Sequence, residues 1–191
     1  MIKSKEDLTL YLKQDKIRLG IERRFPRPFY DEVWKFEIAL RKAEYAVNCK
    51  KGTVYLPYRL LRKLIFHQRS RQCGFTIPLN VFGAGLSIAH YGTIVVNDKA
   101  VIGENCRIQE GVTIGASGGS DAPVIGNNVF IGSGAKILGK IEIADNVAIG
   151  AGAVVTKSCF KQNATLAGVP AKVIGDKGSG RFIMGGKGVN I

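Results

Sequence analysis

An aliphatic residue recurs at every sixth position over much of the second half of the chain, from about residue 84 to residue 160. The series consists of Ile102, Ile108, Ile114, Ile125, Ile131, Ile137, Ile143, Ile149 and Val155, and it breaks only once. A six-residue period is typical of a parallel β-helix, in which each hexad supplies one short strand and one corner. The aliphatic column then stacks along the axis, so the repeat predicts a solenoid.

A slower period indicates how many hexads close one coil. Asn128 and Asn146 are 18 positions apart, and so are Gly134 and Gly152. Three hexads therefore make one turn, and the cross-section is predicted to be triangular. Asn and Gly tolerate a positive φ, which suits the tight corners of such a coil.

One interruption of the repeat predicts an extruded loop. Asn105 and Asn128 are 23 positions apart, as are Gly111 and Gly134, which is one coil plus five residues. We expect the five extra residues to leave the coil as a loop within residues 116–123. Insertions into a packed repeat are more often functional than incidental.

Positive charge is concentrated outside the repeats. Of the net charge of +13, residues 1–75 carry +10, residues 76–160 carry −1 and residues 161–191 carry +4. The two basic ends favour contact with phosphates or an anionic membrane surface.

The chain has no run of eighteen apolar residues and no apolar leader, so we expect a cytoplasmic protein. Cys49, Cys73, Cys106 and Cys159 lack disulfide or zinc spacing and are expected to be reduced, packed thiols.

Three helices are predicted before the solenoid. Ser4, with Asp7 three residues later, is expected to cap a short first helix. A second is predicted over residues 30–48 and a third over residues 57–72. The third is amphipathic and basic: its leucines either pack on the base of the solenoid, which we favour, or rest on an anionic membrane. The predicted domains are a helical segment over residues 1–74, a solenoid over residues 75–175, and a flexible basic tail over residues 176–191.

His90 is a candidate catalytic residue. Counting back by sixes from Ile102 passes Val96 and reaches His90, so a histidine stands where the repeat predicts an aliphatic residue. An imidazole titrates near neutral pH and can take a proton from a hydroxyl group. A packed structural histidine is the alternative.

Three segments resemble the hexapeptide-repeat acyltransferases, specifically the branch of serine O-acetyltransferases and polysaccharide O-acetyltransferases. They are "FTIPLNVFGAGLSIAHYGTIVVNDKAVIGENCRIQEGVTIG", "IGSGAKILGKIEIADNVAIGAGAVV" and "LAGVPAKVIG". The resemblance implies a left-handed β-helix, a homotrimer, and acetyl-CoA as a co-substrate in a cleft between neighbouring solenoids, without a metal. It also implies that His90 is the general base.

Further site residues are implied by the same resemblance. The segments that match the coenzyme cleft contain Ser133, Gly134, Ala135, Lys136, Ala151, Gly152, Ala153, Ala167, Gly168 and Lys172. Acceptor contacts are expected from Tyr91, Glu110 and Asp121. Glu110, Asp121 and Thr76 are the polar candidates for orienting His90.

Departures from the family pattern bear on the acceptor. Serine acetyltransferases have an Asp immediately before the base, where this chain has Ala89, and a second supporting Asp where it has Phe75. Their extruded loop carries an Arg-His pair before a proline, where this chain has Asp121 and Ala122. Because the carboxylate of an amino-acid acceptor needs a cation, these differences favour a sugar hydroxyl.

We therefore expect an acetyl-CoA-dependent O-acetyltransferase acting on a sugar hydroxyl in surface polysaccharide biosynthesis. Serine O-acetyltransferase of cysteine biosynthesis is the alternative. A non-catalytic scaffold is a third possibility, which His90 argues against. A nucleic-acid binder is disfavoured because no aromatic residues are interleaved with the basic cluster.

Overall fold

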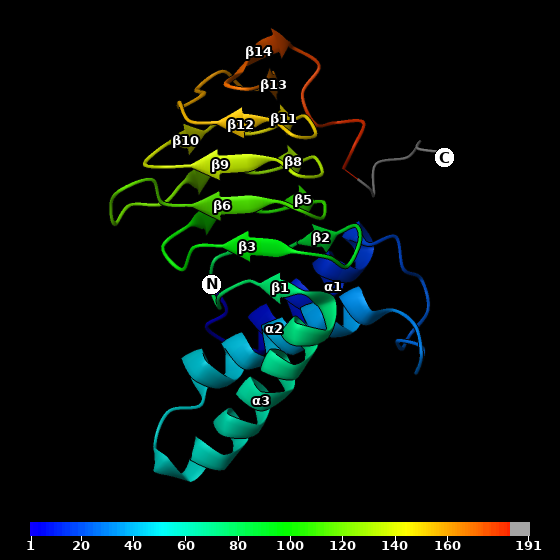
Figure 1. Cartoon of the computed structure of the whole chain (residues 1–191). Helices are drawn as coiled ribbons and strands as arrows, with labels where there is room; N and C mark the ends of the chain where they lie inside the picture. The colour runs from blue at the N-terminus through cyan, green and yellow to red at the C-terminus, as the bar shows by residue number, and fades with distance from the viewer. Residues whose placement is uncertain (184–191) are drawn as a thin grey trace.

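The computed structural model describes residues 1–183, which form a helical base and a left-handed parallel β-helix standing on it (Figure 1). The helices are α1 (Lys5–Arg18), α2 (Glu32–Cys49) and α3 (Leu56–Cys73), and the short 3₁₀ helix η1 (Thr53–Tyr55) precedes α3. The strands rise from β1 beside the helices to β14 at the far end of the solenoid. The predicted fold class is confirmed.

The strands form three sheets, one for each side of the triangular coil. The first side has the order β1 (Phe75–Thr76), β3 (Ile94–Val96), β6 (Thr113–Gly115), β9 (Lys136–Leu138), β12 (Val154–Val155). The second has the order β10 (Glu142–Ile143), β7 (Val124–Ile125), β4 (Val101–Ile102). The third has the order β14 (Ala171–Gly175), β13 (Thr165–Gly168), β11 (Ala148–Ile149), β8 (Phe130–Ile131), β5 (Arg107–Ile108), β2 (Ser87–Ile88). We call these the first, second and third sheets.

The strand register confirms the predicted coil length. Ile137 pairs with Val155, 18 positions later, whereas Ile114 pairs with Ile137, 23 positions later. The extra residues lie between β6 and β7, in the segment where the loop was predicted. The aliphatic series lies in one continuous buried core. Full burial of each such side chain contributes about 1.5–3 kcal/mol.

The corners adopt the backbone conformation that their residues predict. Asn105, Asn128 and Asn146 have φ of 58°, 54° and 61°. Each side-chain amide also donates to the next asparagine along the axis, from Asn105 to Asn128 and from Asn128 to Asn146, both at 3.0 Å. These bonds satisfy polar groups at the corner between the second and third sheets.

The helices lie close to their predicted positions. The Ser4 hydroxyl accepts the Asp7 backbone N–H at 3.0 Å and caps α1 as expected. The preferred interpretation of α3 is wrong, however. Leu60, Leu61 and Leu64 are 57%, 51% and 64% exposed and do not pack on the solenoid. Among the described residues, no helix is long and apolar enough to cross a membrane.

A buried ion cluster joins α1 and α2 to the first coil. Arg41 is fully buried; its guanidinium donates to Asp15 at 2.7 Å and to Glu44 at 3.1 Å, and also to the Phe82 and Gly83 carbonyls. Asp15 in turn accepts the backbone N–H groups of Gly85 and Leu86. The cluster therefore satisfies backbone groups at the end of the solenoid that no further coil covers.

Glu37 likewise accepts a backbone N–H group of the first coil, in this case from β2. Its Oε1 accepts the Ile88 N–H at 3.1 Å, while Oε2 is buried without a hydrogen-bond partner. Burial, and then the charge of Asp15, raise the pKa of this carboxyl well above its usual range. Glu37 thus binds a proton more readily in the folded chain than in water, beneath the strand that leads to His90.

The chain beyond β14 lies against the outer face of the third sheet. Phe182 stacks on Phe130 with ring centroids 4.3 Å apart, and the Ser179 N–H donates to the Asn146 carbonyl at 3.0 Å. A Cβ at Gly178 would stand 2.4 Å from that same carbonyl oxygen, so only glycine fits there. The prediction of a flexible tail from residue 176 did not anticipate these contacts; residues 184–191 lie outside the described part. All four cysteines are free thiols.

Replacing Arg41 tests the ion cluster. We expect Arg41→Ala to lower the free energy of unfolding by about 3–5 kcal/mol, because Asp15 and Glu44 would remain buried without their cation. Chemical denaturation measures the change. Lys63→Ala, on the exposed side of α3, is the control and should change it by less than about 0.5 kcal/mol.

Glu37 makes a pH-dependent contribution. The pKa of Glu37 is higher in the folded chain than in the unfolded chain, so the folded chain binds a proton at this carboxyl more tightly. Protonation of Glu37 therefore stabilises the fold at low pH, and this contribution is lost as pH rises through the folded pKa. Glu37→Gln keeps the acceptor for Ile88 but does not titrate. Relative to this variant, the native chain should lose up to about 1.4 kcal/mol per pH unit in that window. Parallel curves of unfolding free energy against pH would contradict the assignment.

Candidate functional site

Four successive corners line up along one edge of the solenoid, where the third sheet passes into the first. They follow β2, β5, β8 and β11, which are stacked neighbours in the third sheet. From the helical base upward, these corners carry His90 with Tyr91, then Glu110, then Ser133 with Gly134, then Ala151 with Gly152. The fold therefore gathers most of the predicted catalytic and coenzyme residues on a single edge.

His90 does not occupy the inward position that counting by sixes predicts. Ile88 pairs with Ile108 and fills the aliphatic column instead. From Ile88 to Val96 is eight positions, whereas from Ile108 to Ile114 is six, so the first corner contains two additional residues. These residues carry His90 out of the core, and its side chain is exposed. An exposed imidazole is accessible to a substrate, whereas the packed structural histidine that was the alternative would not be.

Glu110 is the carboxylate associated with His90. It lies one coil above, because β5 pairs with β2. Contact with Ser133 lowers the pKa of Glu110 most, and its own backbone N–H and the charge of His90 lower it further. The Glu110 Oε2 atom is buried without a hydrogen-bond partner. Glu110 thus remains ionised near the imidazole and has an oxygen available to accept a proton donor.

Gly92 allows this approach between coils. Its φ is 141°, and a Cβ placed there would stand 3.1 Å from the Glu110 Cβ. Further along the edge, Gly111, Gly134 and Gly152 have φ of 74°, 71° and 66°. The Gly column thus adopts the conformation predicted for corner residues, and it leaves the upper edge without bulky side chains.

The predicted coenzyme residues differ in accessibility. Ala151 and Gly152 are exposed, and Ser133 and Gly134 are partly exposed. Ala135 and Ala153 are fully buried in the core, so only their backbone could meet a ligand.

The predicted cationic residues of the coenzyme cleft also differ. The Lys136 ammonium donates to the Gly111 carbonyl at 2.6 Å and to the Thr113 hydroxyl at 3.1 Å, which holds it on the coil. Lys172 is exposed on β14, where it pairs with Ala167 of the antiparallel strand β13. Gly168, at the end of β13, is also exposed.

Two of the predicted polar residues lie elsewhere. Asp121 is on the extruded loop between the first and second sheets, at a different corner from His90. Its carboxylate forms an exposed ion pair with Lys140 at 3.1 Å. Thr76 is exposed on β1 in the first sheet. Among the three candidates for orienting His90, the structure therefore favours Glu110.

A cavity of about 500 Å³ lies beside the histidine corner. It is lined by Tyr91 from that corner, Gln72 from α3, and a run of residues at the start of α2, namely Phe29, Tyr30, Asp31, Glu32 and Val33. We call it the Tyr91 cavity. Sequence inspection missed the part contributed by residues 29–33, because their proximity to Tyr91 arises only when the helices pack under the first coil.

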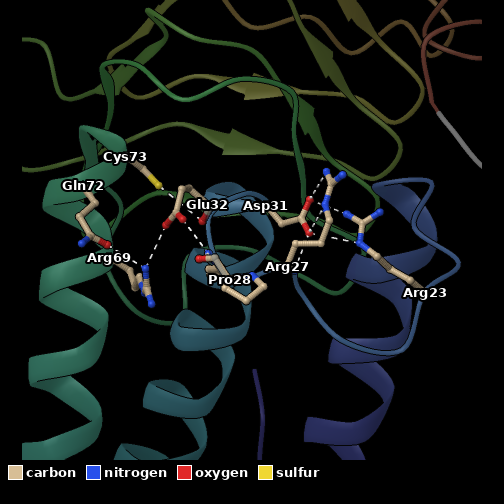
Figure 2. Close-up of polar contacts among 9 residues, drawn as sticks. Arg23, Arg27, Pro28, Asp31, Glu32, Arg69, Gln72 and Cys73 are labelled. Atoms are coloured by element: carbon tan, nitrogen blue, oxygen red, sulfur yellow. Dashed lines mark hydrogen bonds and ion pairs between the residues drawn. The ribbon is translucent and has the colours of Figure 1, made fainter.

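Two arginines converge on one carboxylate of this cavity (Figure 2). Arg27 donates to Asp31 from its backbone at 2.8 Å and from its guanidinium at 3.1 Å, and Arg23 forms an ion pair with the same group. Burial acts to raise the pKa of Asp31, but the hydrogen bonds from Arg27 and Arg23 outweigh it and hold the pKa well below its usual range. The cavity lining itself contains two carboxylates, those of Asp31 and Glu32, and no cationic residue; Arg23 and Arg27 hold Asp31 from outside the lining.

Similarity to known proteins covers both the repeats and the helical base. The family model "Bacterial transferase hexapeptide (six repeats)" matches residues 122–157. A serine acetyltransferase of Synechococcus elongatus is 41% identical over 119 residues, which cover 60% of this chain and 48% of that protein. The chain thus spans about half the length of this curated relative.

Two solved structures are similar over most of the chain. The Brucella abortus serine acetyltransferase in complex with coenzyme A is 31% identical, with a TM-score of 0.61 over 91% of this chain and 68% of that one. The Neisseria gonorrhoeae serine acetyltransferase in complex with serine is 30% identical, with a TM-score of 0.61 over 89% and 68%. The expectation of a sugar acceptor in surface polysaccharide biosynthesis is wrong, because these relatives are serine acetyltransferases.

Gly92 offers a test of the site geometry. We expect Gly92→Ala to lower the free energy of unfolding by about 1–3 kcal/mol, because the new Cβ meets Glu110 and the backbone is in a region that L side chains rarely adopt. Gly119→Ala is the matched control: a Cβ there has open space and an ordinary φ, so unfolding should be almost unchanged. Equal effects of the two substitutions would show that the corner tolerates a side chain.

Proposed function

The chain belongs to the hexapeptide-repeat acyltransferases, and on that premise we propose that it transfers an acetyl group from acetyl-CoA to the hydroxyl of L-serine. The observation that carries the proposal is the exposed His90, which shares its corner with Tyr91 of the Tyr91 cavity and lies at the lower end of an edge of small residues. The cavity provides room for a small acceptor. The edge allows a pantetheine chain to lie close to the coil.

His90 acts in this proposal as the general base. Its imidazole takes the proton from the serine hydroxyl as the oxygen attacks the thioester carbonyl, and the tetrahedral intermediate collapses with release of the coenzyme thiolate. The proton on the imidazole then passes to that thiolate, so the base is regenerated. Glu110 stabilises the imidazolium through its charge. Holding both substrates on one edge supplies orientation, which accounts for a large part of such rate enhancements.

The Tyr91 cavity is the proposed site of the serine zwitterion, which requires a cation for its carboxylate and an anion for its ammonium group. Arg23 and Arg27, which pair with Asp31 at the wall of the cavity, are the cations proposed for the first. The carboxylate of Glu32, which lines the cavity and also pairs with Lys35 and Arg69, is the anion proposed for the second. This reconciles a serine acceptor with the absence of the Arg-His pair, because the cation comes from the segment before α2.

The coenzyme and the assembly are part of the same proposal. The edge from Ser133 to Gly152 holds acetyl-CoA, and exposed Lys172 is the cation best placed to meet its phosphates. The active assembly is a homotrimer with the coenzyme between neighbouring solenoids. The mass of the particle by light scattering tests the assembly directly.

His90→Ala should lower kcat/KM for serine by about a hundredfold to ten-thousandfold, the usual contribution of a general base. Release of free thiol from acetyl-CoA measures the rate. The chain has two histidines, and His67→Ala, on exposed α3, is the matched control that should retain native turnover. Because both side chains are exposed, neither variant should lose stability.

The acceptor is tested in the same assay with L-serine beside free sugars and a serine analogue that lacks the carboxylate. Serine should be turned over, and the analogue should show a KM raised at least about tenfold, since an ionic contact is lost. Thiol release with the sugars but not with serine would overturn the acceptor. Loss of turnover in His67→Ala rather than in His90→Ala would overturn the catalytic assignment.

A further inference from the structure

A second cavity, of about 360 Å³, lies between α2, α3 and the segment that joins α1 to α2. Its lining contains five cationic residues and no acidic residue; the cations are Arg24, Lys35, Lys42, Arg62 and Arg69. We call it the basic cavity. It shares no lining residue with the Tyr91 cavity.

Most of this charge is not neutralised. Lys35 and Arg69 both pair with the single carboxylate of Glu32, at 2.7 and 2.9 Å, and Figure 2 shows Arg69 reaching Glu32 from α3. Over residues 1–183 no ion pair is formed by Arg24, Lys42 or Arg62. Five positive charges therefore share one negative charge at the boundary of the cavity, which is unfavourable unless an anion is bound.

Arg62 provides an independent indication of a ligand. Its Nε atom is buried and has no hydrogen-bond partner, although the neighbouring guanidinium carbon lies 5.1 Å from the centre of the Tyr58 ring. A buried N–H without an acceptor is costly. A guanidinium presents its N–H groups in a fork that matches the oxygens of a phosphate.

The remaining walls are apolar. Phe25, Ile38 and Ile65 line the cavity between the cations. Arg24 lies over the Phe25 ring at 5.1 Å, so a flat cationic and aromatic surface borders the opening. A bare inorganic anion would leave this surface unused, whereas a phosphate ester with an apolar group would cover it.

We propose that the basic cavity binds a phosphate monoester that carries an apolar group, with Arg62 and Lys42 holding the phosphate and Phe25 contacting the apolar part. The inference does not depend on the proposed acetyl transfer, because neither His90 nor the edge from Ser133 to Gly152 takes part. Lys35 and Arg69 also line the cavity, and their positions are fixed by ion pairs with Glu32. Their positive charges attract the same phosphate.

Calorimetric titration of the full chain, free of coenzyme, with phenyl phosphate tests the site. Saturable binding is expected at one site per chain, tighter than that of inorganic phosphate. Arg62→Gln and Lys42→Gln together should weaken it at least tenfold. Arg24→Gln should also weaken it at least tenfold, and because Arg24 is exposed, this variant tests the site without disturbing the fold. Lys63→Gln removes the same charge from the exposed side of α3 and should bind like the native chain.

A second arm identifies the source of the phosphate. Vesicles containing phosphatidic acid, whose headgroup is a phosphate monoester, are compared with vesicles of phosphatidylcholine alone, with phenyl phosphate as a competitor. Displacement of the chain from the anionic vesicles by phenyl phosphate would assign the cavity to a lipid headgroup, and binding of phenyl phosphate without vesicle binding would assign it to a free metabolite. Absence of saturable binding, or equal affinity in the native chain and all the variants, would overturn the proposal.

Discussion

The structure depends on the constraint that each coil must place an aliphatic side chain directly above the one below. Ile88, Ile108, Ile131 and Ile149 form such a column through successive parallel pairs. Once the columns are in register, the corners between them are also in register. Residues that are 18 or 23 positions apart in the chain therefore become neighbours on one edge, which is how the small residues between Ser133 and Gly152 come together.

The same constraint explains how a histidine reaches solvent without disturbing the core. Two extra residues at the first corner leave Ile88 in the column and place His90 outside it. The corner then requires an unusual backbone at Gly92, and the absence of a side chain there lets Glu110 approach from the next coil. A local lengthening of the chain thus creates an accessible imidazole beside a carboxylate, while hydrophobic packing remains continuous.

The helical base has a different role, because it both closes the solenoid and builds most of the Tyr91 cavity. Buried carboxylates of α1 and α2 satisfy backbone N–H groups of the first coil, including those of Gly85 and Ile88. Since the start of α2 is held against the first coil by these contacts, Asp31 and Glu32 come to lie beside Tyr91. Arginines offset the free energy that burying these carboxylates costs. Arg41 forms an ion pair with Asp15 in the buried cluster, and Arg23 and Arg27 form ion pairs with Asp31.

The sequence by itself determined the features that follow from local periodicity. The six-residue repeat, the 18-residue coil, the loop near residue 120 and the Asn and Gly corners could all be predicted, because each depends on spacing along the chain and on the φ that a residue tolerates. Only the tertiary structure decided that Ile88 rather than His90 fills the column, that the leucines of α3 are exposed, and that Asp31 lies beside the histidine corner. These outcomes depend on how helices and coils far apart in the chain pack against one another, and no periodic pattern in a single segment encodes that packing.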